Sequence, residues 1–596
     1  MTKLKELCKR FKLDIICLTG LFFIFCFIAY KRAPYLSLFI IDIGREAFIP
    51  DQMLQGKLLY KDLFNIFGPL GYQINCLFFS IFGSKISTLE FAGLLNSSII
   101  LLLYYIIARF FTSVKTVFLY TLLMMFMCVF YIDLSSYVFP YTYSLIYAIT
   151  FVLVSIVCFL ITLKYQSSQK ISYLIYLSYF FAGAAITSKY DYIPYCLILF
   201  ILTLIYIKPS FKKILLCMTA FFTVPIISYG ILFLQGVTFA DYIDNLNHAN
   251  NLANSSYLHY LYRKSSGTML PIEVYPQSII NFFIGNICFI ILSLAYYFIN
   301  NLKKTKYLIF LYDVIYLILG YVIIYHISIN TFFLFLNYVV FLIFTYFLIL
   351  KIKKANISNF NLYFILIIFS ICFCAKTFFF INLKTYGTFT VPLLILVFIV
   401  FLQEYLPNRF TFINGNLIKR LMALLMILFT VGSYIYSERL TITQKTLIYT
   451  EKGYIATAKK LADTIQNLLN YINTNIDKNA SIFVVPEGVM INYVTGRKMP
   501  IPKLYSIVPN HLDAFGNSYI LNELSEHKPD YIIICKRPIA EYGMNEVFGK
   551  NFQERKIYQW ILNNYKYQKS IDTEAVENKS LPFIKTKFEF AIYKKQ

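Results

Sequence analysis

Two adjoining stretches near the start of the chain decide the fold: the apolar run IICLTGLFFIFCFIAY over residues 15–30, and the polar segment IDIGREAFIPDQMLQGKLLYKDLFNIFGPLGY over residues 41–72. The first run has the length and composition of a membrane-spanning helix. No small-residue cleavage site follows it, so we expect a retained first span rather than a signal peptide. The second stretch places four carboxylates directly beyond that span: Asp42, Glu46, Asp51 and Asp62.

The composition of the whole chain indicates a polytopic membrane protein. Of its 596 residues, 59% are hydrophobic and only 14% are charged, against about 25% charged residues in typical soluble proteins. The net charge of +24 does not indicate a nucleic-acid-binding protein, because the basic residues of 1–436 gather in short clusters at every second gap between apolar runs. That distribution is the positive-inside pattern of a membrane protein.

The apolar runs predict about 13 transmembrane helices. The N-terminal segment MTKLKELCKRFK has five basic residues against one acid, which places the N-terminus in the cytoplasm. The loop 31–85 and the residues after 436 then lie on the outer face. The predicted spans are 14–30, 87–108, 116–132, 142–163, 171–187, 192–207, 214–234, 278–299, 307–325, 331–350, 360–375, 388–403 and 421–436.

From residue 437 the composition changes to that of a soluble domain, with 22 Lys and Arg against 16 Asp and Glu. The segments SIFVVP (481–486) and DYIIIC (530–535) are short apolar runs typical of buried parallel strands. The segment ATAKKLADTIQNLLNYINTNI (456–476) has apolar residues at helical spacing. We therefore expect residues 437–596 to form a small extracytoplasmic α/β domain with an acceptor-binding or structural role.

The acids of the spanning part gather on the outer side, with nine of 14 in predicted outer loops. One interpretation is a solvated loop whose carboxylates cap helices and pair with Arg45, Lys57 and Lys61. Against it, Asp42 lies close to the membrane surface and shares a helix face with Glu46, four residues further on. A partly desolvated carboxylate at that place is suited to act as a general base, so we predict Asp42 and Glu46 as catalytic residues.

The same loop resembles the first outer loop of the GT-C glycosyltransferase superfamily, especially the branch with protein O-mannosyltransferases and lipid A aminoarabinose transferases. The matching features are an Asp soon after the first span, an L-x-G-x-x-x-Y-x-D segment, a later Pro and a Phe-Gly ending. They fall on Asp42, Leu54, Gly56, Tyr60, Asp62, Pro69, Phe82 and Gly83. Where that family often has a second acid beside the Asp, this chain has Ile43.

The resemblance implies an enzyme that transfers a sugar from a polyprenyl phosphate to an envelope acceptor (a lipid, a glycan or a protein). Asp42 would deprotonate the acceptor hydroxyl, and the anomeric carbon would be inverted. The expected location is the bacterial cytoplasmic membrane, with the donor lipid, the acceptor and the bilayer as partners.

A departing lipid phosphate needs nearby positive charge or hydrogen-bond donors. Lys189 and Asp191 follow the fifth span, while Lys376 and Lys384 precede the twelfth in a segment similar to the basic, aromatic loop that holds the lipid phosphate in the family. Each lysine also has a plain structural interpretation, as a side chain that anchors a helix end at the interface. The predicted substrate-binding residues are Asp62, Lys189, Asp191, His326, Lys376, Lys384 and Tyr386.

No D-x-D motif occurs in the predicted outer loops, and the 12 cysteines lack metal-ligand spacing. We expect no essential metal and no cofactor apart from the donor itself. Two alternatives stay open. A transporter or flippase of lipid-linked saccharides should show charges deep in its spans and paired broken helices. A glycan polymerase or ligase of related architecture would transfer a whole glycan from a pyrophosphate carrier.

Overall fold

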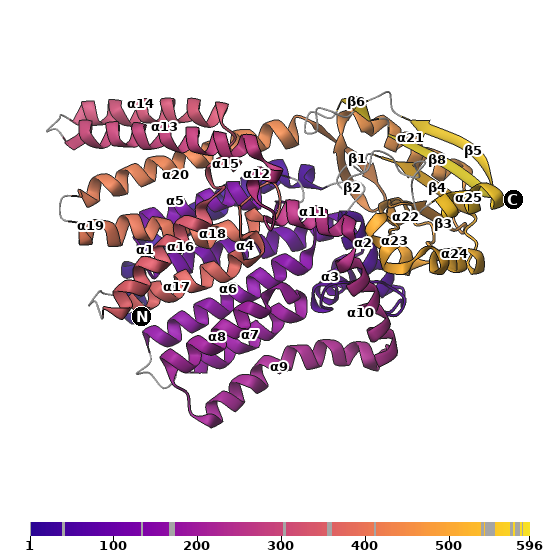
Figure 1. Ribbon diagram of the computed structural model, residues 1–596, viewed down its shortest axis with the longest axis horizontal. Coiled ribbons are helices and arrows are strands. Elements are labelled where there is room, and N and C mark those ends of the chain that lie inside the picture. Colours follow the sequence, from indigo (N-terminus) through magenta and orange to yellow (C-terminus); the bar gives the residue numbers. More distant parts are fainter. Residues whose placement is uncertain are drawn as a thin grey trace.

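A computed structural model describes residues 2–37, 42–132, 135–165, 173–301, 306–353, 360–410, 413–537, 542, 555–572, 576–577, 585–586 and 588–596. The larger part of the molecule is a bundle of helices, and the smaller part is a domain with a sheet (Figure 1). The N-terminus lies in the bundle, and the C-terminus lies at the far end of the smaller domain (Figure 1). The predicted fold class, a polytopic helical protein with a small C-terminal α/β domain, is confirmed.

Eleven helices of the described part are long and apolar enough to cross a membrane, and each coincides with a predicted span. Two further predicted spans, 116–132 and 171–187, fall on the shorter apolar helices α5 (Val114–Met124), continued to Val129, and α7 (Leu174–Ser188); residues 171–172 lie outside the described residues. The main helices of the eleven spans are α1 (Thr2–Arg32), α4 (Ile86–Arg109), α6 (Tyr143–Lys164), α8 (Ile193–Leu202), α9 (Phe211–Leu234), α13 (Pro276–Asn301), α14 (Lys306–His326), α16 (Leu336–Ile352), α17 (Phe360–Phe373), α18 (Gly387–Val400) and α20 (Gly415–Ser437).

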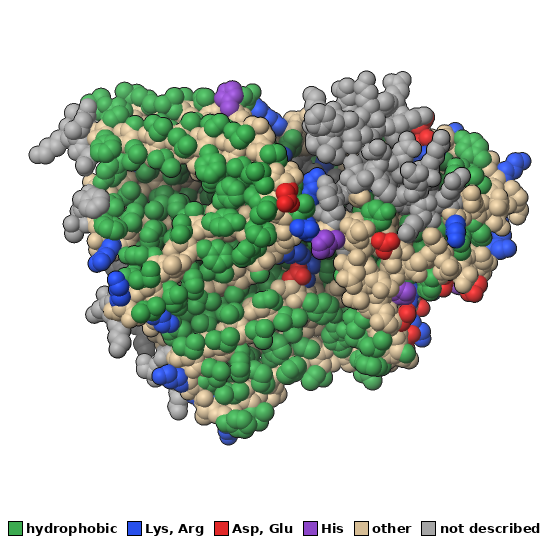
Figure 2. Space-filling model, in the orientation of Figure 1, with side chains coloured by type: hydrophobic (Ala, Val, Ile, Leu, Met, Phe, Trp, Pro, Cys, Tyr) green, Lys and Arg blue, Asp and Glu red, His purple; other side chains and the backbone are tan. Residues whose placement is uncertain are grey.

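The outward surface of the bundle is apolar. In the spans of α9 and α13 only 11% of the residues are buried inside the protein, and large side chains such as Ile226 and Ile291 point outward. Figure 2 shows apolar side chains covering the visible face of the bundle, and a mixed group of charged side chains where the bundle meets the C-terminal domain. A continuous apolar surface of this extent fits contact with lipid rather than with water.

The first outer loop contains two helices, α2 (Asp42–Leu54) and α3 (Leu70–Phe82). Helix α2 packs against α22 (Val489–Thr495) of the C-terminal domain. The contact is close because Gly44 has no side chain: a Cβ atom there would lie 3.1 Å from both the Cβ and the backbone N of Met490. The first loop is therefore fastened to the C-terminal domain.

The second long loop also lies between the bundle and the C-terminal domain (Figure 1). It folds into α10 (Phe239–Asn254), α11 (Ser256–Ser266) and α12 (Pro271–Val274), and a short helix, α15 (Ile329–Phe332), precedes α16. Helix α10 packs against α23 (Pro509–Phe515). Asn65 and Asn245 join the two loops, since Asn245 Oδ1 accepts from the Asn65 backbone N at 3.1 Å and Asn245 Nδ2 donates to the Asn65 O at 2.7 Å.

The C-terminal domain is built on a four-stranded sheet in the order β3-β4-β8-β5. The predicted parallel pair is confirmed as β3 (Ile482–Val485) and β4 (Tyr531–Lys536). The sheet is mixed, because β8 (Glu589–Lys595) runs antiparallel to β4 and to β5 (Tyr565–Asp572). The other elements are the pairs β1 (Lys445–Thr450) with β2 (Gly453–Ala458) and β6 (Val576–Glu577) with β7 (Lys585–Thr586), and the helices α21 (Lys459–Asn475), α24 (Asn517–Glu526) and α25 (Arg555–Asn564).

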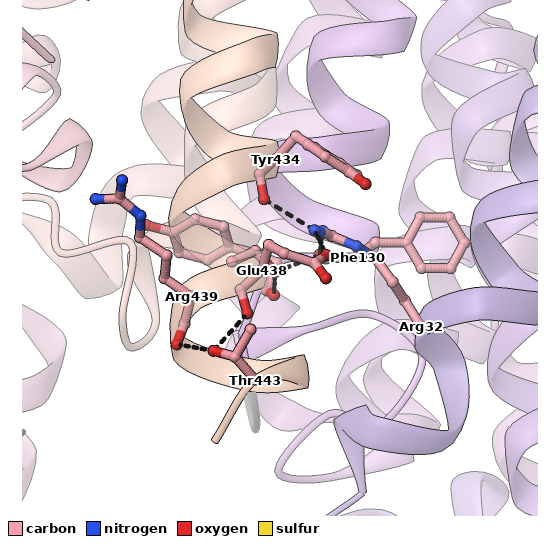
Figure 3. Close-up of polar contacts among 8 residues, drawn as sticks. Arg32, Phe130, Tyr434, Glu438, Arg439 and Thr443 are labelled. Atoms are coloured by element: carbon pink, nitrogen blue, oxygen red, sulfur yellow. Dashed lines mark hydrogen bonds and ion pairs between the residues drawn. The ribbon is translucent and has the colours of Figure 1, made fainter. Parts of the chain in front are cut away.

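A buried arginine joins the first and last spanning helices (Figure 3). Arg32, at the end of α1, is 2% exposed. Its Nη2 donates to the backbone O of Tyr434 at 2.8 Å and to Oε2 of Glu438, just beyond α20, at 2.6 Å. A buried charge is tolerated only when it is paired and hydrogen-bonded, so this contact holds the two helix ends together where the chain enters the C-terminal domain.

Candidate functional site

A cavity of about 350 Å³ lies between the bundle and the C-terminal domain, and we call it the interface cavity. Its volume falls within the range of about 300–1,000 Å³ that is usual for small-molecule sites. Its floor comes from the bundle and the two outer loops: Asp42, Arg45, Ile66, Phe67, Ser135, Tyr141, Tyr262, Lys384, Tyr386 and Phe389. Its roof comes from the C-terminal domain: Glu487, Val489, Tyr505, Ser506, Asn510, His511 and Arg537.

Asp42 is the first residue of α2 and lines the floor. Its Oδ1 lies 3.0 Å from Nη1 of Arg45, and its side chain is 22% exposed. Burial raises the pKa of the Asp42 carboxyl above its usual value, against the opposing charges of Arg45 and Arg537. The floor thus presents a carboxylate with an increased affinity for a proton, which is the property that a general base requires.

Glu46, the second predicted catalytic acid, lies outside the cavity lining and is fully buried. Its Oε1 accepts from Tyr72 Oη at 2.8 Å and lies 3.1 Å from Arg45 Nη2. Its Oε2 accepts from the backbone N of Tyr143 at 2.9 Å. The expectation that Glu46 acts directly in the reaction conflicts with this placement, because its oxygens are occupied by groups that it holds in place.

Arg45 connects the elements of the floor. Besides the two carboxylates of α2, its guanidinium donates from Nη2 to the backbone O of Tyr141 at 2.6 Å and lies 5.6 Å from the centre of the Phe67 ring. A guanidinium offers five donors in a planar fork, so one arginine can fix several groups at once. Arg45 therefore sets the position of Asp42 relative to the aromatic floor.

Lys189, Asp191 and Lys376 lie together, but behind the floor rather than in it. Asp191 Oδ2 is 3.6 Å from Lys189 Nζ and 2.8 Å from Lys376 Nζ. Lys189 lies 4.0 Å from the centre of the Phe67 ring, and Lys376 lies 4.4 Å from that of Tyr386. Burial lowers the pKa of Lys189 to about 7, although Asp191 opposes the shift. Both lysines support rings that line the cavity and do not line it themselves.

Lys384 and Tyr386 do line the floor. Lys384 is exposed and makes no ion pair within the described residues; its nearest aromatic contact is the Tyr436 ring, 5.7 Å from Nζ. The Tyr386 ring stands edge-on to Tyr141 at 5.0 Å and stacks on Tyr262 at 6.1 Å. Lys384 is thus a cation that can meet an anionic group of a ligand over an aromatic surface.

Two further predicted substrate-binding residues also lie outside the cavity lining. Asp62 accepts from the backbone N of Leu58 at 2.8 Å and so closes a turn of the first loop. His326 is exposed at the end of α14, with its ring 5.3 Å from that of Tyr325. Neither residue lines the cavity, so their predicted role in substrate binding conflicts with their placement.

The roof contains an ion pair that the sequence reasoning did not identify. Arg537 donates from Nε to Glu487 Oε1, and both side chains are less than a tenth exposed. Glu487 follows β3 and Arg537 follows β4. Because the carboxyl ends of neighbouring parallel strands meet at one edge of a sheet, the predicted pair of strands was a signal that could have placed these two residues together.

Two neutral polar residues of α23 complete the roof. Asn510 is 5% exposed, and neither its carboxamide oxygen nor Nδ1 of His511 has a hydrogen-bond partner among the described residues. Burial, together with the charge of Arg45, lowers the pKa of His511 to about 3, so its ring is neutral. Nothing in the local sequence singled out this pair. Among the described residues, no group of three or more His, Cys, Asp or Glu side chains is placed to hold a metal ion.

No protein-family model and no curated protein sequence matches the chain. Among solved structures, ArnT from Cupriavidus metallidurans bound to undecaprenyl phosphate is similar over 96% of this chain and 98% of that one, with 10% identity and a TM-score of 0.46. The oligosaccharyltransferase AglB from Archaeoglobus fulgidus, in complex with an inhibitory peptide and a dolichol-phosphate, is similar over 89% and 70%, with 11% identity and a TM-score of 0.46.

Proposed function

We propose that this protein is a membrane glycosyltransferase that moves a sugar from a polyprenyl-phosphate donor to a hydroxyl group of an envelope acceptor. The observation that carries the proposal is the interface cavity, where the half-buried carboxylate of Asp42 and the exposed cation of Lys384 line one hollow beside a lipid-facing bundle. A donor with an apolar tail and a polar head needs this combination of surfaces. The resemblance of the first outer loop to GT-C enzymes supplies the class of reaction.

In the proposed reaction, an oxygen of Asp42 accepts the proton of the acceptor hydroxyl while that hydroxyl oxygen attacks the anomeric carbon of the sugar. The bond between the anomeric carbon and the phosphate oxygen breaks, and the electron pair leaves with the lipid phosphate. The attack comes from the face opposite the leaving group, so the configuration inverts. The raised pKa of Asp42 favours proton uptake, and the charge of Arg45 opposes the shift that burial causes.

The leaving lipid phosphate carries negative charge that cations stabilise. We assign this role to Lys384, which is exposed to the cavity, with Arg45 as a second cation of the floor. Lys189, Asp191 and Lys376 receive a supporting role, because they contact the Phe67 and Tyr386 rings from outside the cavity lining.

The cavity end of the bundle is proposed to face the outside of the bacterial cytoplasmic membrane. Three helices that begin near the C-terminal domain or the cavity, α4, α6 and α18, lead to basic residues at their other ends: Arg109, Lys164 and Arg409. Basic residues are favoured on the cytoplasmic side. The N-terminus is then cytoplasmic, and the C-terminal domain is extracytoplasmic.

The test measures sugar transfer by the full chain in nanodiscs, with undecaprenyl-phosphate sugars labelled in the sugar and with an envelope fraction as acceptor. The variant Asp42→Asn should lose about 100-fold or more of the rate, since a general base contributes about 10²–10⁴-fold. The matched control Asp62→Asn removes a carboxylate of the same loop outside the cavity and should retain most of the rate.

Full transfer by the Asp42→Asn variant would disprove the assignment of the base. Transfer only from a pyrophosphate-linked glycan would favour the polymerase or ligase alternative. Movement of the labelled lipid across the bilayer without any transfer would favour the transporter.

A further inference from the structure

We propose that the roof of the interface cavity holds a sugar-recognition subsite, in which Asn510 and His511 form hydrogen bonds with hydroxyl groups of the sugar on the donor lipid. This proposal rests on the proposed function and names the part of the donor that the C-terminal domain recognises. The ligand chemistry is a neutral, hydroxyl-bearing ring, and the donor is its source.

The first observation is that two adjacent side chains of the roof lack partners. Asn510 is buried, yet its carboxamide oxygen receives no hydrogen bond within the described residues, and the same holds for Nδ1 of His511. Both residues line the cavity. Those two atoms are closed off from solvent, but Asn510 Nδ2 and His511 Nε2 are not, and neither nitrogen makes a hydrogen bond with a described residue. These nitrogens are the atoms that hydroxyl groups of a ligand in the cavity would reach.

The second observation is that α23 is fixed before any ligand arrives. Ser255 Oγ donates to Asp513 Oδ2 at 2.6 Å, and the His248 ring nitrogen Nδ1 lies 2.9 Å from the Ala514 backbone O. The His511 ring itself packs edge-on against Phe64, with centroids 5.9 Å apart. Binding groups held in this way lose little conformational freedom when they engage a ligand.

The third observation is the division of charge between floor and roof. The charge of Arg537 is balanced by Glu487, and Asn510 is neutral, as is the ring of His511. The exposed cation, Lys384, lies on the floor. An anionic phosphate is therefore drawn to the floor. A carboxamide and a neutral imidazole each offer a donor and an acceptor, as sugar hydroxyls do.

The experiment compares two probes on the full chain in detergent by native mass spectrometry, without any acceptor. The probes are bare undecaprenyl phosphate and the best-bound member of a panel of undecaprenyl phosphates that carry one hexose or pentose. The variant Asn510→Leu should weaken binding of the sugar-bearing lipid by about tenfold or more and leave binding of the bare lipid within about twofold, because an unpaired sugar hydroxyl is penalised only where a sugar is present.

Two further variants make the result specific. His511→Phe keeps a ring of similar size and should show the same selective loss, so the test does not depend on the folding of one variant. Lys384→Met should weaken both lipids to the same extent, since it acts on the phosphate that they share.

Equal effects of Asn510→Leu and His511→Phe on both lipids, or no effect on either, would overturn the subsite. Failure of the wild-type chain to bind either lipid would instead overturn the proposed function and the subsite with it. The two failures are distinguishable because bare undecaprenyl phosphate tests the function without the sugar.

Discussion

The floor and the roof of the interface cavity use polar residues in different ways. On the floor, Asp42 is partly exposed, and burial raises its pKa, which suits the proton-transfer role that we propose for it. On the roof, Glu487 and Arg537 neutralise each other, and Asn510 and His511 are uncharged. The floor can move a proton and hold an anion, whereas the roof can recognise a ligand without any change of charge. Under the proposals above, the bundle performs the chemistry and the C-terminal domain selects the sugar.

The largest effect that would sharpen this comparison concerns the ion pair of the roof. Arg537→Gln leaves the buried carboxylate of Glu487 without its main counter-charge and should lower the free energy of unfolding by about 3–5 kcal/mol. The double variant Glu487→Gln with Arg537→Gln removes both charges and should regain most of that loss. Chemical denaturation in detergent measures both. Equal destabilisation of the two variants would contradict a mainly structural role for the pair.

A second prediction concerns the contact that holds floor and roof together. Gly44→Leu introduces a side chain where a Cβ already lies 3.1 Å from Met490, so the free energy of unfolding should fall by about 1–3 kcal/mol and transfer should slow. The control is Gly230→Leu in α9, because a Cβ at Gly230 meets no atom within 4 Å. Thermal unfolding and transfer rates of the two variants measure the difference. If the two variants had the same thermal stability and the same transfer rate, the close contact between α2 and α22 would not be required.

The third prediction compares two lysines on either side of the floor. Lys384→Met should reduce transfer about tenfold, since it removes a cation that faces the leaving phosphate. Lys189→Met removes a lysine of low pKa that lies behind the Phe67 ring, and its effect should be only a few-fold. Initial rates with a labelled donor measure both. A larger loss of transfer rate for Lys189→Met than for Lys384→Met would indicate that the phosphate binds on the other side of the aromatic floor.

The smallest expected effect is a shift in the pH dependence of transfer. Asp42 acts as a base only when ionised, so the rate should fall as the pH decreases through its raised pKa. Arg537 lowers that pKa, so removing its charge alone in Arg537→Gln should move the acid limb of kcat/KM to higher pH. The double variant with Glu487→Gln also removes a negative charge, so its acid limb should shift less. Profiles of the wild type and the two variants test the sign. A shift to lower pH would contradict the placement of Arg537 near Asp42.

The spans and part of the floor could be predicted because their signals are local. Hydropathy and the alternation of basic clusters located the spans of the bundle, and Asp42, Lys384 and Tyr386 lie in loops directly at span ends. The burial of Glu46 could not be predicted, because its spacing from Asp42 indicates a shared helix face but does not say what that face contacts. Its surroundings are set by Tyr72 and Tyr143, which are distant in sequence.

The roof was harder to predict because it depends on contacts between remote segments. Glu487 and Arg537 become neighbours through the pairing of β3 with β4, which the sequence did indicate. Asn510 and His511 reach the cavity because α23 packs against α10. No periodic pattern in the sequence predicts such a contact. Their lack of partners is visible only once the surrounding atoms have been placed.

The position of α2 against α22 has a consequence for biosynthesis. In the proposed orientation, Asp42 meets the roof of the cavity only after the C-terminal domain has been translated and moved across the membrane, so a nascent protein with every span inserted still lacks half of the interface cavity. Translation that stops early would then leave an inserted but inactive fragment, and the onset of catalysis would report that synthesis was complete.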